Sequence, residues 1–234
     1  MVESSRKRRR ILHTSDFHLS SPGDDACKSL EAVVDAALRS EADLVIIAGD
    51  LFDHNRIEDD LLSFVVGQLK RLPVPAVILP GNHDCLIPGS VLMKEEFWGE
   101  CRNVRIILER EGQMLNLPEL GVSLWGKSID SYDGDFRPLA GIPRPRKDSQ
   151  WNIAIAHGYY VSSTPPMFYS YQISREEIVN SGWDYIALGH IAVFRCICDE
   201  PVKAYYCGSP SITGSVNLVE LDEANGVQVA RYLL

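Results

Sequence analysis

The sequence lacks any segment that could span a membrane. No apolar run in it approaches the roughly 20 residues that a transmembrane helix needs. The basic stretch at 6–10 leads directly into a predicted strand, where a secretory signal would place a long apolar segment. We therefore expect no signal peptide and no membrane partner, and we expect residues 1–9 to form a disordered, basic N-terminus.

Paired cysteines and an excess of positive charge are also missing. The six cysteines include no Cys-x-x-Cys pair, and Cys196 and Cys198 would point to opposite faces of a strand. We therefore expect free thiols and a reducing, cytoplasmic location. The formal net charge of −9 argues against a protein that coats nucleic acid through a broad basic surface, although bound cations could still make a local positive site.

What the chain does contain is a buried strand followed at once by a carboxylate. The apolar run at 44–48 continues into Gly49 and Asp50. An unbroken apolar run of this length predicts a strand buried on both faces, as in a parallel sheet covered by helices. Ligands of open α/β sheets bind beyond the carboxyl ends of the strands, so Asp50 is expected where chemistry takes place.

The segments around this strand predict an alternation of strands and helices. In order they are a strand at 10–14, a helix through 30–38, the strand at 44–48, a helix through 61–69 and a strand at 75–79. This β-α-β-α-β order implies parallel strands joined by right-handed crossovers.

The rest of the chain predicts shorter strands and one more helix. A capping box at 174–177 should open the helix, and Asn225-Gly226 predicts a hairpin turn. Residues 126–150 form a long predicted loop, and such loops are often functional. The length of 234 residues suits a single domain at 10–234. The further strands are expected at 104–108, 113–117, 122–125, 151–156, 185–188, 194–198, 204–207, 216–221 and 227–233.

Potential metal ligands follow several of these strands. A single histidine at a strand end is usually a hydrogen-bonded loop residue, but the same construction at strand after strand is much harder to explain by chance. Imidazole, carboxylate and amide donors together suit manganese, iron or zinc better than calcium or magnesium. We expect His13, inside the first strand, to be structural, and leave His54 open. The strand-end residues are Asp16, His18, Asp50, Asn82, His83, His157 and His190.

These residues resemble the pattern of calcineurin-like metallophosphoesterases, in order and approximate spacing, from residue 11 to about 210. The matching motifs are Asp16-x-His18, Gly49-Asp50-x-x-Asp53, Gly81-Asn82-His83-Asp84, His157 and Gly189-His190. The segments at 49–53 and 206–210 are most similar to SbcD-like DNA repair exonuclease subunits. The resemblance implies an α/β fold, a four-layer α-β-β-α sandwich with two metal ions at the strand ends.

The resemblance also implies a role for each matching residue. The first metal ion would be held by Asp16, His18 and Asp50, and the second by Asp50, Asn82, His157 and His190, with Asp50 as the bridge. Manganese is the expected ion, with iron or zinc as alternatives. A metal-activated water would attack phosphorus while His83 protonates the leaving oxygen as general acid. Asp53 either orients His83 or caps the following helix.

The chain departs from the family pattern at Ala192. Most members continue Gly-His-x-His, and the second histidine completes the first metal site, whereas this chain reads Gly-His-Ile-Ala. The serine/threonine phosphatase branch also lacks that histidine, so we predict a weaker first site rather than an inactive protein. The chain also ends soon after the expected sandwich, without the C-terminal region through which the repair nucleases bind an ATPase, so that partner is left open.

Three functions fit these features. The first is a metal-dependent phosphoesterase that hydrolyses phosphodiester bonds in nucleic acid, such as DNA, or in nucleotides. The second is a phosphomonoesterase or phosphoprotein phosphatase, which would use the same metals and the same acid. The third is a non-catalytic scaffold such as the retromer subunit of this fold. A scaffold has no need of an acid at His83, which favours an enzyme.

Overall fold

Two six-stranded sheets form the centre of this computed structural model, which describes residues 8–162 and 170–234. In the first sheet the order is β14-β13-β1-β2-β3-β4. β1 to β4 pair in parallel, whereas β13 pairs antiparallel with both β1 and β14. The strands are β1 (Arg9–Thr14), β2 (Leu44–Ala48), β3 (Ala76–Leu79), β4 (Val104–Ile106), β13 (Ser215–Asp222) and β14 (Gly226–Leu233).

The second sheet has the order β11-β12-β10-β7-β6-β5. Its inner strands β12, β10, β7 and β6 pair in parallel, and the outer strands β11 and β5 pair antiparallel with their neighbours. A small parallel pair, β8 and β9, lies outside both sheets. The strands are β5 (Gln113–Leu117), β6 (Val122–Gly126), β7 (Trp151–His157), β8 (Tyr159–Val161), β9 (Gln172–Ser174), β10 (Tyr185–Gly189), β11 (Arg195–Cys198) and β12 (Lys203–Tyr206).

β2 is buried along its whole length because both of its faces are covered. Val45 and Ile47 belong to the core under the helices, whereas Ile46 and Ala48 belong to the core between the two sheets. This alternation follows from the two-residue period of a strand. An unbroken apolar sequence is therefore what this position in the fold requires.

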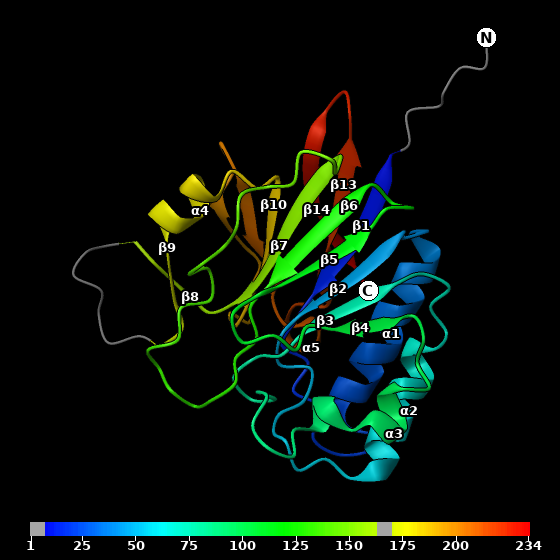
Figure 1. Cartoon of the computed structure of the whole chain (residues 1–234). Coiled ribbons are helices and arrows are strands. Elements are labelled where there is room, and N and C mark those ends of the chain that lie inside the picture. Colours follow the sequence, from blue (N-terminus) through cyan, green and yellow to red (C-terminus); the bar gives the residue numbers. More distant parts are fainter. Residues whose placement is uncertain (1–7, 163–169) are drawn as a thin grey trace.

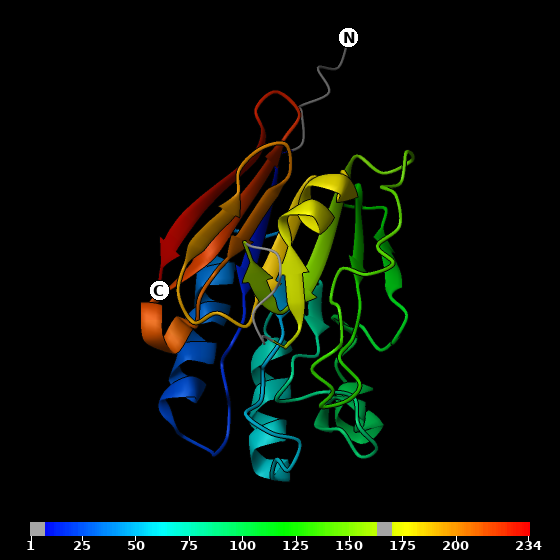
Figure 2. The same ribbon diagram turned by 90° about the vertical axis from the view of Figure 1, so that its left-hand side faces the viewer.

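Helices cover the outer faces of the two sheets (Figures 1 and 2). α1 and α2 pack their apolar faces on the first sheet, and Ile178 of α4 packs with residues of the second sheet. The predicted α-β-β-α sandwich is confirmed. The helices are α1 (Asp25–Arg39), α2 (Asp59–Leu69), α3 (Glu95–Trp98), α4 (Arg175–Ser181), α5 (Pro210–Thr213) and a 3₁₀ turn (Val91–Met93).

Some boundaries differ from the sequence-based predictions. β1 begins at Arg9 rather than at residue 10, because Arg9 pairs with Leu221 and its guanidinium lies 3.2 Å from the Asp43 carboxylate. Most of the N-terminus expected to be disordered, residues 1–7, lies outside the described residues. The predicted loop at 126–150 begins one residue later, because β6 extends through Gly126, and residues 127–150 form no helix or strand. Among the helices in the described part of the chain, none is long and apolar enough to cross a lipid bilayer.

Candidate metal centre

Polar side chains gather where the parallel strands of the two sheets end. β2 contacts both β7 and β10 across the interface between the sheets, so strands from both sheets lie side by side in the sandwich (Figure 1). The first sheet supplies Asp16 and His18 after β1, Asp50 after β2, and Asn82 and His83 after β3, and the second supplies His157 at the end of β7 and His190 after β10.

The backbone at this edge adopts conformations that side-chain-bearing residues rarely use. The φ angles are 56° at Asp16, 55° at His18, 51° at Asp50 and 96° at His190. Backbone strain of this kind clusters at functional sites, where the surrounding structure holds it in place. A Cβ at Gly81 would collide with the Asp50 carboxylate, so the glycine before Asn82 is required for the two loops to approach.

Four side chains form the deep group, defined as Asp50, Asn82, His157 and His190. His157 Nδ1 donates to the Ala48 carbonyl at 2.8 Å, which turns Nε2 toward the centre. There Nε2 lies 3.1 Å from Asp50 Oδ2 and 3.0 Å from Asn82 Oδ1. Asn82 Oδ1 also lies 2.9 Å from His190 Nδ1. The hydrogen bond from His157 to the Ala48 carbonyl is of the kind that fixes the tautomer of a metal-ligating histidine.

The deep group has the electrostatics of a cation site. Burial by itself would lower the pKa of His157, but the Asp50 carboxylate outweighs burial and raises that pKa to about 9. Burial would raise the pKa of Asp50, yet His157 and the surrounding hydrogen bonds hold it well below the usual range. Burial, followed by the charge of His157, lowers the pKa of His190 to about 4. Oxygen and nitrogen acceptors that converge in a buried space need a positive charge between them, either a proton or a metal ion.

The first-metal group, defined as Asp16, His18 and Asp50, lies beside the deep group and shares Asp50 with it. Its ligand atoms all lie within 4.8 Å of one another. The backbone N–H of His190 donates to both carboxylate oxygens of Asp16 at 3.1 Å, which fixes the orientation of that carboxylate. Ala192 adds no ligand, and its backbone carbonyl accepts a hydrogen bond from Ser209. The first-metal group therefore has three ligand side chains, one fewer than the deep group.

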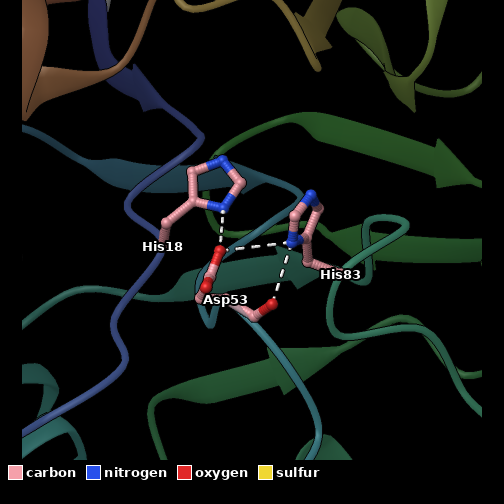
Figure 3. A group of neighbouring side chains, drawn as sticks. All are labelled: His18, Asp53 and His83. Carbon is pink, nitrogen blue, oxygen red and sulfur yellow. Dashed lines mark hydrogen bonds and ion pairs between the residues drawn. The ribbon is translucent and has the colours of Figure 1, made fainter.

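The rim group, defined as His18, Asp53 and His83, is partly exposed to solvent. Figure 3 shows these three side chains turned toward one another. Asp53 Oδ1 lies 3.0 Å from His18 Nδ1 and 3.2 Å from His83 Nδ1. His83 Nδ1 also lies 2.8 Å from the Asp53 carbonyl oxygen, and the His83 backbone N–H donates to Asp50 Oδ1 at 2.9 Å. The N-cap of α2 is Glu58, so Asp53 does not cap that helix and instead faces the two histidines.

The structure thus gathers all the ligands predicted from sequence, with Asp53 and His83 beside them. The two remaining histidines lie apart. His13 is buried between the sheets, 2.8 Å from the Tyr185 hydroxyl, as expected for a structural residue. His54 is exposed, and its ring nitrogen accepts the backbone N–H of Arg56. It belongs to none of the candidate metal-binding groups found among residues 8–162 and 170–234.

Sequence reasoning missed three residues that shape this centre. Asp84 is fully buried, and its two carboxylate oxygens accept the backbone N–H groups of Gly81 and Phe52 at 2.7 and 3.2 Å, tying together the loops that follow β3 and β2. Ser15 donates to the Asp16 carboxylate. Tyr171, with φ of 55°, places its ring 6.1 Å from that of His190. Only Asp84 carried a local signal, as the last residue of its motif.

Comparisons with known proteins agree with this geometry. A family model described as calcineurin-like phosphoesterase matches residues 9–194. The uncharacterized metallophosphoesterase YhaO of Bacillus subtilis is 27% identical over 221 residues, covering 85% of this chain and 52% of that protein. The DNA double-strand break repair protein Mre11 of Saccharolobus solfataricus is 25% identical over 214 residues, covering 87% of this chain and 55% of that protein. This chain spans about half the length of these curated relatives.

Solved structures resemble the whole sandwich. A novel archaeal phosphodiesterase superposes with a TM-score of 0.53 at 14% identity, covering 96% of this chain and 99% of that one. The protein TT1561 of Thermus thermophilus superposes with a TM-score of 0.62 at 13% identity, with the same coverage of 96% and 99%. At these identities the likeness shows the fold.

Proposed function

The chain belongs to the calcineurin-like phosphoesterase family, and from that membership we propose that it is a metal-dependent phosphodiesterase acting on nucleic acid or nucleotides. One observation carries the proposal. Donors from five strand ends meet around the buried Asp50 carboxylate, and a histidine that none of the ligand positions requires, His83, stands beside them. A centre that only stabilised the fold would have no use for that histidine.

The side chains present fit two divalent cations. The deep group offers two imidazoles, an amide oxygen and a carboxylate, and the first-metal group adds Asp16 and His18, with Asp50 shared between the two sites. When bound, two such ions supply a water of lowered pKa and positive charge for the phosphoryl oxygens. Mixed nitrogen and oxygen ligands suit manganese, iron or zinc, and manganese is the ion that we propose.

We infer that His83 acts as the general acid, and its contacts support this role. Its Nδ1 is engaged by the Asp53 carbonyl oxygen at 2.8 Å and by the Asp53 carboxylate at 3.2 Å. These acceptors hold Nδ1 of the ring on the side of Asp53, which leaves Nε2 as the nitrogen that can approach the leaving oxygen. Asp53 is thus a positioning residue for His83.

The preference for a diester is supported by similarity rather than by an individual residue. The Saccharolobus relative is described as a DNA double-strand break repair protein and one structural neighbour as a phosphodiesterase. We further infer that residues 10–234 act as one domain, because β1 pairs directly with β13 near the C-terminus. A cytoplasmic location remains part of this proposal. A phosphomonoesterase is the second candidate, since the same groups would serve it.

The test compares hydrolysis of bis-p-nitrophenyl phosphate and p-nitrophenyl phosphate by the manganese-loaded protein. A higher kcat/KM on the diester, abolished by a chelator and restored by manganese, is the expected result. A higher value on the monoester would replace the proposal with the phosphatase. Absence of metal-stimulated hydrolysis on both esters, with two bound ions confirmed by elemental analysis, would contradict the proposal. His54→Ala is the control variant, because His54 lies outside the ligand groups.

A further inference from the structure

The rim group has the dimensions of a metal site in its own right (Figure 3). Zinc binds nitrogen and oxygen at about 2.0–2.1 Å, so neighbouring ligand atoms of a tetrahedral site lie about 3.3–3.4 Å apart. Asp53 Oδ1 lies 3.0 Å from His18 Nδ1 and 3.2 Å from His83 Nδ1, and all three ligand atoms lie within 4.8 Å of one another. Small shifts would seat a zinc ion among them.

Solvent reaches all three side chains of this group, whereas it does not reach His157 of the deep group. The side chains of His18, Asp53 and His83 are 36%, 44% and 41% exposed, whereas that of His157 is 0% exposed. An ion from solution could therefore enter directly and keep a water molecule as its fourth ligand. Zinc binding through Nδ1 requires each imidazole to be neutral, with its proton on Nε2.

His18 links the rim group to the first-metal group. Its Nδ1 faces Asp53 at 3.0 Å, and its Nε2 faces Asp50 Oδ2 at 3.9 Å. A neutral imidazole has one nitrogen lone pair to offer. An ion in the first-metal group and an ion in the rim group therefore compete for the same ring. Since Ala192 supplies no side-chain ligand, the first-metal group holds its ion with no more protein side chains than the rim group offers.

The chemistry of the two groups selects different metals. The first-metal group offers two carboxylates and one imidazole, whereas the rim group offers two imidazoles and one carboxylate. Nitrogen-rich sites suit zinc, and oxygen-rich sites suit manganese. We propose that the rim group is a separate, zinc-selective binding site that competes with the first metal ion for His18.

Zinc at this site would inhibit the enzyme, a consequence that rests on the proposed function. A zinc ion bound to Nδ1 would hold the His83 ring at the rim, so that His83 could no longer serve as the proposed general acid. The ion would also draw His18 away from the first-metal group. Zinc is added to the manganese-loaded protein. Once more zinc is present than the deep group can take up, hydrolysis should fall, whereas the same amount of extra manganese should leave hydrolysis unchanged.

The binding experiment does not depend on activity. Zinc is titrated into the metal-free protein by calorimetry, and bound zinc is counted by elemental analysis after removal of free ions. Asp16→Ala should still bind two zinc ions, one in the deep group and one in the rim group. Asp16→Ala with Asp53→Ala should bind one. Asp16→Ala with Asp59→Ala is the matched control and should bind two, because Asp59 is exposed at the start of α2 and pairs with Lys94.

Either of two outcomes would overturn the proposal: a single zinc ion in Asp16→Ala, or two zinc ions in the variant that also lacks Asp53. If Asp16→Ala does not fold, as judged by circular dichroism, Asp16→Asn takes its place. In the wild-type protein the His83 Nδ1 resonance in a ¹⁵N spectrum should shift with the second equivalent of zinc, and an unchanged resonance would also refute the site. Zinc binding at the rim in a protein that hydrolyses neither ester would uphold this inference while the proposed function fails.

Discussion

The two halves of the metal centre, the deep group and the first-metal group, differ in how many ligands they offer and in how firmly those ligands are held. In the deep group, each ligand is buried or fixed by a second contact, as His157 is by the Ala48 carbonyl at 2.8 Å. On the other half, His18 is about a third exposed and the position that could complete the site holds Ala192. Asp50 belongs to both halves, so its carboxylate connects the four-ligand deep group with the three-ligand first-metal group.

This difference teaches that the number of ligands and the hydrogen bonds that orient them act together. The deep group has four ligands and an outer hydrogen bond on His157, and such hydrogen bonds raise metal affinity. The first-metal group has the outer contacts of Asp16 but one ligand fewer, and its histidine, His18, is about a third exposed. We therefore expect one ion to be retained through purification and the other to exchange with solution. Four experiments would break or sharpen this contrast.

Removing a deep ligand should have the largest effect. His157→Ala deletes an imidazole that contacts Asp50, Asn82 and the Ala48 carbonyl. A metal ion contributes several kcal/mol of transition-state stabilisation, and each 1.36 kcal/mol is tenfold in rate, so diester hydrolysis should fall about 10³-fold or more. Elemental analysis should show that the tightly bound ion is lost. His54→Ala should change neither quantity, and a His157→Ala protein that keeps its ion would show that the deep group is not the tight site.

The next experiment distinguishes the loss of the proposed general acid, His83, from the loss of a metal ion. His83→Gln should lower kcat by about 10²–10⁴-fold, the range typical of a general acid, while the tightly bound ion stays because His83 is not in the deep group. The loss should be greater for a DNA oligonucleotide than for a p-nitrophenyl ester, since p-nitrophenolate leaves without a proton. Equal losses on the two substrates would argue that His83 acts on the metals instead.

The sequence predicted the ligands of both halves at strand ends, where the structure has them, but not the contacts around them. The apolar run at 44–48 is typical of a strand covered on both faces, and the motif residues expected after it and after the neighbouring strands lie at strand ends in the structure. The contacts that complete the centre join distant residues, and local periodicity carries no information about them. Ser15 and Cys207 lie 192 positions apart yet touch at 3.1 Å.

The elements missed by the sequence analysis have the same physical origin. β8 and β9 are strands of three residues each, too short to show a period of two. Their pairing places Tyr171, which directly precedes β9, against His190. The side-chain role of Asp53 was likewise undecidable, because capping a helix and facing two histidines need the same residue type in the same loop.

Restoring the missing ligand should narrow the contrast between the two halves. Ala192→His places an imidazole where the chain has only a partly exposed methyl group. Partners in the outer shell of a metal site already change affinity about 10–100-fold, so a new direct ligand should tighten the first ion by at least about tenfold. Chelator competition should then show the fast phase of manganese release slowing toward the slow one. Ala192→Leu is the control for bulk, and slowing in that variant as well would contradict coordination as the cause.

The smallest expected effect tests whether hydrogen bonds behind Asp16 hold its carboxylate in place for the first metal ion. Burial raises the pKa of Cys207 far above its usual value, so its thiol stays protonated and can donate to Ser15 Oγ at 3.1 Å, while Ser15 donates to Asp16. One hydrogen bond contributes about 1 kcal/mol, so Cys207→Ala should weaken the first manganese ion by roughly fivefold, measured by calorimetry. Cys207→Ser keeps a donor at the same place and should bind manganese nearly as tightly as the wild type. If the alanine and serine variants weaken binding equally, packing rather than the hydrogen-bond chain supports Asp16; if neither does, the weakness of the first site arises entirely at Ala192.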